Sequence, residues 1–195
     1  MPTKQAKNKR EQDMLEGRGL WVASSFLSNR IKILAKKNKP FYIGDIKQAH
    51  RLLFMTTNEP EIAGEYRTKF RDNGIDLERQ DGTYLKFTTW EKIPYEMGLL
   101  NKKLVELTEN MPSPNNEQDY ENIVSSAARL SHELTRIHPF KNGNGRMSRL
   151  LINAILLRAG LYPIPFMGHL KMIKPKLKKT YYNAMYQADN GNFSQ

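Results

Sequence analysis

The chain of 195 residues contains no cysteine, which excludes disulfide bonds and any chemistry that depends on a thiolate. It also lacks any apolar run close to the ~18 to 20 residues that a membrane helix needs. The first ten residues lack the apolar segment of a secretory signal, and no internal repeat or low-complexity tract is present. We therefore expect one globular domain without a membrane partner, either cytoplasmic or delivered into a host cell.

Acidic residues are in the minority, with 20 Asp and Glu against 31 Lys and Arg, and the net charge is +11. Such a charge could indicate nucleic-acid binding, but the basic residues are spread out and no nucleic-acid motif accompanies them. Their clusters lie at residues 4–10, 36–39 and 171–179. We interpret them as solvated faces that attract an acidic partner or a phosphate ligand, and we do not expect nucleic acid as a partner.

The pattern of apolar residues predicts a mainly α fold with one small β-hairpin. Residues 1–13 are polar and basic and predict a mobile tail, while 14–39 predict an N-terminal helical segment, with the amphipathic helix or helices between 14 and 35. The main domain is expected over 40–195, with a first helix capped by Asp45 and further helices at 93–107, 120–137 and 175–188. Alternating residues around Asp81-Gly82 predict a hairpin within 68–90.

A phosphate site is predicted at His138-Pro-Phe-Lys-Asn-Gly-Asn-Gly-Arg146, which runs into an apolar helix. Pro139 disfavours helical geometry in the residue before it, so the preceding helix should end at His138. Glycines at 143 and 145 permit positive φ and allow backbone N–H groups to converge on an anion. The dipole at the start of the next helix favours phosphate, and Arg146 and Arg149 share one of its faces.

This stretch resembles the signature of Fic-domain proteins, His-Pro-Phe-x-(Asp/Glu)-Gly-Asn-Gly-Arg followed by a second arginine. The resemblance implies a Fic-type helical bundle with a β-hairpin flap over the active site, and transfer of AMP from Mg-ATP to a Ser, Thr or Tyr hydroxyl of a target protein. It implies that His138 is the general base, and the pKa of a free imidazole, about 6.5, suits that role. The other implied roles are phosphate binding by Gly143, Asn144, Gly145, Arg146 and Arg149, and structural support by Pro139 and Phe140.

The signature departs from the family at Asn142, where Asp or Glu would hold Mg²⁺. An amide offers a neutral oxygen and no charge, so metal binding and metal-assisted catalysis should both weaken. Three interpretations stay open: a slow AMP transferase, an enzyme that transfers another phosphate-linked group, and a catalytically impaired binding protein or toxin–antitoxin component. If the protein is a toxin–antitoxin component, a small antitoxin partner would supply an inhibitory glutamate.

Other positions resemble further parts of the family. Ser24 and Ser28 fit a degenerate form of the inhibitory motif (Ser/Thr)-x-x-x-Glu-(Gly/Asn), whose glutamate pairs with the second arginine, with Ser28 in place of the glutamate. Tyr181 and Tyr182 are candidates for an adenine pocket. The flap at 68–90 would bind the target by β-augmentation. From the residues alone, we interpret His50 as a packed or hydrogen-bonded structural histidine and His132 as a surface residue.

Overall fold

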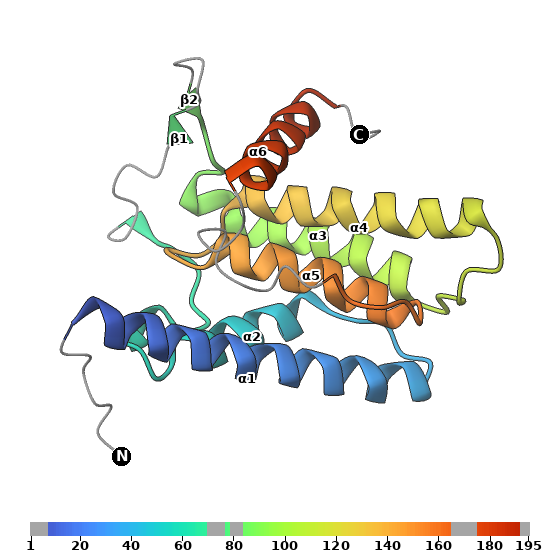
Figure 1. The fold of residues 1–195 in the computed structure, drawn as a ribbon, viewed down its shortest axis with the longest axis horizontal. Helices are drawn as coiled ribbons and strands as arrows, with labels where there is room; N and C mark the ends of the chain where they lie inside the picture. Colours follow the sequence, from blue (N-terminus) through green and yellow to red (C-terminus); the bar gives the residue numbers. More distant parts are fainter. Residues whose placement is uncertain (1–7, 70–76, 79–83, 165–174, 192–195) are drawn as a thin grey trace.

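The computed structural model describes residues 8–69, 77–78, 84–164 and 175–191, in which the helices α1 to α5 contribute to a shared core. Figure 1 shows α1 (Lys9–Lys36) and α2 (Ile43–Phe54) along one side of α3 (Ile93–Thr108), α4 (Glu117–Ile137) and α5 (Asn144–Arg158). The last helix is α6 (Pro175–Asp189), and short 3-10 turns lie at Pro60–Ile62 and Trp90–Lys92. The prediction of a mainly α fold is confirmed. Within the described ranges, no helix combines the length and apolar character needed to cross a bilayer.

The helix before the signature, α4, packs into the core through the apolar stripe that the sequence predicts. All five stripe residues of α4 are buried: Ile123, Ala127, Leu130, Leu134 and Ile137. Fully burying a leucine-sized side chain contributes about 1.5–3 kcal/mol, so this face holds α4 firmly in the core. The hydroxyl of Ser131 also donates to the carbonyl of Ser148 at 3.0 Å, which ties α4 to α5. The signature loop is therefore fixed at both ends by buried helices.

The N-terminal helix begins earlier than predicted. The side chain of Asn8 accepts a hydrogen bond from the N–H of Glu11 at 3.0 Å, so Asn8 caps a helix that starts at Lys9. A mobile tail reaching residue 13 is therefore wrong for residues 9–13, and the rest of that predicted tail, 1–7, lies outside the described residues. A Cβ on Gly19 would lie 2.1 Å from the carbonyl oxygen of Leu53, so this glycine allows α1 and α2 to cross closely.

The predicted cap of α2 is also corrected. Tyr42 is the N-cap residue, and Asp45 lies in the first turn, where its carboxylate accepts from the N–H of Tyr42 at 3.3 Å. The same carboxylate pairs with Arg30 of α1 at 2.9 Å. Asp45 therefore links the two helices instead of starting one of them, since a carboxylate at the third helical position can reach back to the cap.

Two short strands and α6 stand at the end of the bundle that carries the signature (Figure 1). Strands β1 (Leu77–Glu78) and β2 (Tyr84–Leu85) pair antiparallel, while the predicted Asp81-Gly82 turn lies outside the described residues. On α6, Asp189 accepts a hydrogen bond from His132 Nε2 at 2.9 Å, and the side chain of His132 is only 12% exposed. The predicted surface position of His132 is corrected to a partly buried one, because a helix distant in sequence covers one side of its ring.

Candidate active site

His138 lies where the sequence predicts, immediately after the last residue of α4. It takes the left-handed conformation, with φ 52° and ψ 56°, and its N–H donates to the carbonyl of Leu134 at 3.1 Å. This conformation is uncommon for residues other than glycine and turns the chain sharply away from the helix axis. The His138 ring is half-buried, and its centroid lies 4.0 Å from the ring centroid of Phe87. The imidazole is thus presented at the tip of a rigid helix.

The loop after His138 is closed by one buried amide. The side chain of Asn144 accepts from the N–H of Phe140 at 3.0 Å and donates to the carbonyl of Phe140 at 2.6 Å. Gly143 precedes α5 with φ 81°, and a Cβ there would lie 2.7 Å from a carbon of the Phe54 ring. Glycine is required at 143 because of its positive φ and because a Cβ would clash with Phe54. The side chain of Asn144 closes the loop through its two hydrogen bonds to the backbone of Phe140.

Three aromatic rings in contact, which we call the ring platform, support this loop: Phe54, His50 and Phe140, with the Phe54 ring tilted by 41° against that of His50. The centroids of His50 and Phe140 are 3.8 Å apart with planes 8° from parallel, and those of His50 and Phe54 are 4.8 Å apart. Both His50 and Phe140 are fully buried. Phe140 therefore packs beneath the loop, and its structural role in the signature stays a prediction.

His50 also controls the backbone of the signature. Its Nδ1 accepts from the N–H of Gly64 at 3.0 Å, so the proton lies on Nε2, which donates to the carbonyl of Asn142 at 3.0 Å. Burial lowers the pKa of His50 to about 4, so the ring is neutral near pH 7. The interpretation of His50 as a hydrogen-bonded structural histidine is confirmed, and its partner proves to be the signature loop.

The side chain of Asn142 is already engaged within the loop. Its Oδ1 accepts from the N–H of Gly143 at 2.7 Å and from Nη2 of Arg146 at 3.3 Å. The described residues contain no group of three acidic or histidine side chains arranged to hold a metal. Mg²⁺ prefers several oxygen ligands with carboxylate charge, so position 142 fits this ion poorly.

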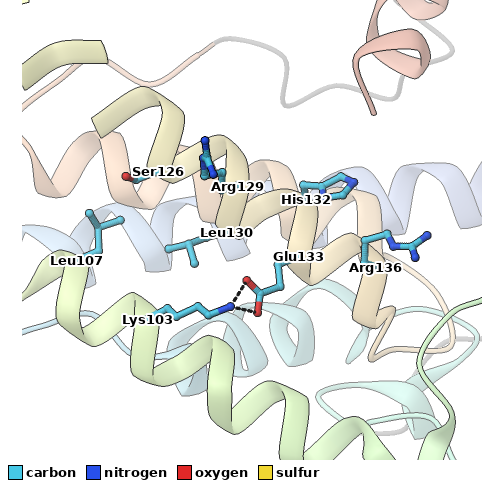
Figure 2. A pocket seen from close by; sticks show the side chains of 8 residues that line it. All are labelled: Lys103, Leu107, Ser126, Arg129, Leu130, His132, Glu133 and Arg136. Carbon is cyan, nitrogen blue, oxygen red and sulfur yellow. Dashed lines mark hydrogen bonds and ion pairs between the residues drawn. The ribbon is translucent and has the colours of Figure 1, made fainter. Parts of the chain in front are cut away.

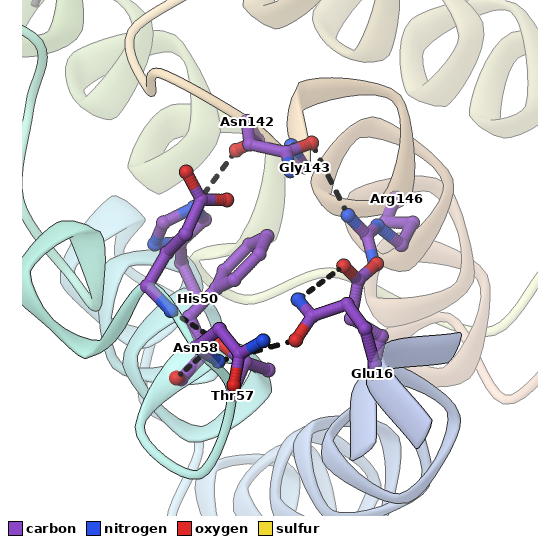
Figure 3. Close-up of polar contacts among 10 residues, drawn as sticks. Glu16, His50, Thr57, Asn58, Asn142, Gly143 and Arg146 are labelled. Atoms are coloured by element: carbon purple, nitrogen blue, oxygen red, sulfur yellow. Dashed lines mark hydrogen bonds and ion pairs between the residues drawn. The ribbon is translucent and has the colours of Figure 1, made fainter. Parts of the chain in front are cut away.

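Arg146 is held by an acidic residue of α1, as Figure 3 shows. Its Nη1 donates to the carboxylate of Glu16, and the two side chains are 10% and 12% exposed. Gln12 donates to the other oxygen of Glu16 at 2.9 Å and itself accepts from the N–H of Asn58 at 3.2 Å. The Arg146 guanidinium also lies 5.0 Å from the Phe54 ring centroid. The Glu16 carboxylate therefore accepts a hydrogen bond that Arg146 would otherwise donate to a phosphate.

The two signature arginines share a helix face, and both are largely shielded from solvent. Arg149 is 5% exposed, and the Arg146 side chain is 10% exposed. A Cβ on Gly145 would come within 3.3 Å of Nη1 of Arg149. Gly145 thus leaves room for the buried guanidinium directly beneath the first turn of α5, where helix N–H groups lack partners within the helix.

The remaining predicted residues lie elsewhere. Ser24 and Ser28 line a small cavity of about 180 Å³ between α1 and α5, together with Leu150 and Asn153 but without Arg149. The carboxylate that α1 supplies comes instead from Glu16, which the sequence reasoning missed. A signal existed, since Glu16-Gly17 matches the end of the inhibitory pattern and Gln12 stands at its Ser/Thr position. Tyr181 and Tyr182 lie on α6, but their side chains fall outside the described residues.

A second hollow lies apart from the signature, on the surface between α3 and α4 (Figure 2). It has a volume of about 500 Å³, and no signature residue lines it. Lys103 donates to both oxygens of Glu133 across it, at 2.8 and 2.9 Å. The chemistry-bearing residues therefore gather at the end of α4 and not in the larger hollow.

Comparison with known proteins places this arrangement in a family. The model of the Fic/DOC family matches residues 40–156, more than half of the chain. Protein adenylyltransferase Fic of Nematostella vectensis is 30% identical over 166 residues, which cover 82% of this chain and 31% of the relative. A Fic-domain-containing signaling protein from Bacteroides thetaiotaomicron matches with a TM-score of 0.60 and 25% identity, over 94% of this chain and 60% of that one. Fic-1 of C. elegans, residues 134–508, shares the fold with a TM-score of 0.63 at 24% identity, over 99% of this chain and 47% of that one.

The chain spans about a third of the length of that curated relative. The matched range nevertheless includes the whole signature loop, His50 of the ring platform and the start of α5. The Nematostella relative carries the name of an enzyme class, protein adenylyltransferase. On the family match together with the geometry of the signature, the chain belongs to the Fic/DOC family.

Proposed function

We propose that this protein transfers AMP from ATP to a Ser, Thr or Tyr hydroxyl of a target protein, and that Glu16 restrains the reaction. The observation that carries the proposal is the placement of His138 beside the glycine loop and Arg146, on one rigid support. A base, an anion-binding turn and a cation at one place are what phosphoryl-type transfer requires. The names of relatives agree with this activity.

In the proposed reaction, the target hydroxyl attacks the α-phosphorus of ATP while His138 accepts its proton. The bond from the α-phosphorus to the bridging oxygen breaks, and pyrophosphate leaves. The backbone of Gly143 and Gly145 and the start of α5 bind phosphate oxygens, and Arg146 and Arg149 offset their charge. Because Asn142 fits Mg²⁺ poorly, no step of this reaction depends on a metal, and an accompanying Mg²⁺ stays an expectation from the family resemblance.

The restraint follows from the pairing of Glu16 with Arg146. A guanidinium that donates to a carboxylate is less available to a phosphate, since both ligands compete for the same N–H groups. Because this carboxylate comes from the same chain, we favour restraint in cis over a separate antitoxin partner.

The hairpin within 68–90 is proposed as the docking edge for an extended target segment.

Two other functions remain as alternatives. Transfer of another phosphate-linked group would use the same loop, since none of its contacts selects adenine. An impaired binding protein would keep the nucleotide site without transfer, and the neutral Asn142 is the observation that favours it.

The test uses purified protein, host lysate, Mg²⁺ and ATP labelled at the α-phosphate, with γ-labelled ATP as the control for phosphorylation. Wild type is compared with His138→Ala, Asn142→Asp and Glu16→Ala. Protein-bound label that Glu16→Ala increases and His138→Ala abolishes in that background would support restrained AMP transfer. Absence of label from every variant, including the combined Glu16→Ala and Asn142→Asp protein, would refute it and favour another donor or a binding role.

A further inference from the structure

The buried side chain of Arg67 connects the hairpin region to the signature. It is 2% exposed, although it carries a full charge, and it follows the turn at Gly64. Its Nε donates to the carbonyl of His138 at 2.7 Å, and its Nη2 donates to the carbonyl of Thr88. Its own N–H donates to the carbonyl of Pro139 at 2.8 Å. Arg67 thus bonds both to the start of the signature loop and to the segment that follows β2.

A cation is suited to the end of α4 for a physical reason. The last carbonyls of a helix lack partners within the helix and lie at the negative end of its dipole. His138 must also be held in its left-handed conformation, which costs about 1 kcal/mol for a residue other than glycine. Hydrogen bonds from a charged donor are stronger than neutral ones, so the guanidinium can secure this turn. Arg67 therefore supports the backbone that aims the His138 imidazole.

The contact with Thr88 brings the hairpin into the same unit. Thr88 follows β2 (Tyr84–Leu85) closely, and its neighbour Phe87 packs its ring 4.0 Å from the His138 ring. The segment after β2 therefore contacts His138 directly through Phe87 and indirectly through Arg67. Only a planar guanidinium presents several N–H groups in a fixed fork, so a lysine could not serve both carbonyls equally.

We propose that Arg67 is a positioning residue that couples the hairpin to His138, so that a target docked on β2 and the base that receives its proton stay aligned. This inference rests on the proposed transfer reaction. Arg67 acts through His138 and Thr88 and has no contact with substrate in this scheme. A purely structural role would instead support folding without affecting the alignment.

Arg158 provides a matched control for that structural alternative. It is also a buried arginine, 7% exposed, and its Nη1 donates to the carbonyl of Met111 at 3.4 Å. It lies at the far end of α5 from the signature. Arg158→Lys should therefore lower Tm without changing transfer or ATP binding.

The kinetic test compares Arg67→Lys and Arg67→Met with Arg158→Lys, each in the Glu16→Ala background. We expect Arg67→Lys to lower kcat about tenfold or more and to raise KM for the target protein, since a lysine cannot keep charged hydrogen bonds to both carbonyls. The Kd for ATP should stay within about twofold, because neither carbonyl lies in the segment from Gly143 to Arg146 that would bind the phosphates. Equal losses of Tm with unchanged kcat in Arg67→Lys and Arg158→Lys would overturn the proposal. If Arg67→Met does not fold, Arg67→Lys carries the test.

Hydrogen exchange provides a second measurement, which does not depend on the transfer activity of the protein. Arg67→Lys should speed exchange about tenfold or more in peptides that cover 84–92 and 134–141 together, while Arg158→Lys leaves both unchanged. Coupled loss of protection with no transfer by any variant would refute the proposed function and support the coupling. Normal transfer with both peptides unchanged in Arg67→Lys would overturn the coupling and leave the proposed function standing.

Discussion

Replacing Glu16 should tighten ATP binding by an amount that the structure allows us to estimate. The Glu16 and Arg146 side chains are 10–12% exposed, so their bond is poorly screened by solvent. A hydrogen bond to a charged group contributes about 1.5–3 kcal/mol. ATP must displace that bond to reach Arg146, and 1.4 kcal/mol corresponds to a factor of ten. Glu16→Ala should therefore lower the Kd for ATP about 10- to 100-fold.

The same substitution should destabilise the protein without ligand. Arg146 would lose its carboxylate partner while still partly buried, so the free energy of unfolding should fall by about 1–2 kcal/mol. Bound ATP should restore that loss, because a ligand that binds only the folded state raises stability with its concentration. Glu16→Gln keeps a neutral acceptor and should give effects about half as large.

The assay is isothermal titration with ATP, followed by thermal unfolding with and without ATP. Asp13→Ala is the matched control, because Asp13 is an exposed carboxylate on the same helix. It removes the same charge without touching Arg146. Equal Kd values for wild type, Glu16→Ala and Asp13→Ala would refute the view that Glu16 competes with phosphate.

The remaining predictions concern stability and the attachment of α6. The fold holds His50 neutral, with its pKa lowered to about 4, so its contribution is complete above pH 6.5 and is lost as the pH falls from 6.5 towards 4. Urea unfolding across this range should show a loss of about 3 kcal/mol, which His50→Gln should remove; an unchanged pH profile in that variant would contradict the assignment. Gly143→Ala should cost about 1–3 kcal/mol because of its φ of 81° and the clash with Phe54, whereas Gly98→Ala, where nothing lies within 4 Å, should stabilise by about 0.5–1 kcal/mol. Asp189→Ala should speed hydrogen exchange of the α6 amides, since it removes an acceptor that joins this helix to His132 and Arg136 of α4; unchanged exchange rates would show that Asp189 does not hold α6 in place.

Much of the local structure was predictable because it depends on neighbouring residues. Pro139 determines that α4 ends at His138, and the apolar stripe of α4 determines which face is buried. The signature loop could be recognised for the same reason, since its glycines and arginines lie within one turn and one helix start. The cap of α2 was misplaced because an aspartate is favoured both at the N-cap and in the first turn, and only the bonds of Asp45 to Arg30 and to the Tyr42 N–H show that it lies in the first turn.

The sequence by itself determined the helices, the signature loop and the chemistry of its side chains, because short-range sterics and periodicity act within a few residues. Only the tertiary structure decided which residues reach that loop from elsewhere. The pairs Glu16–Arg146, His50–Asn142 and Arg67–His138 join residues separated by 130, 92 and 71 positions. Such pairs form only when α1, α2 and the segment after Gly64 have packed against the ends of α4 and α5, and no local pattern records the direction of that packing.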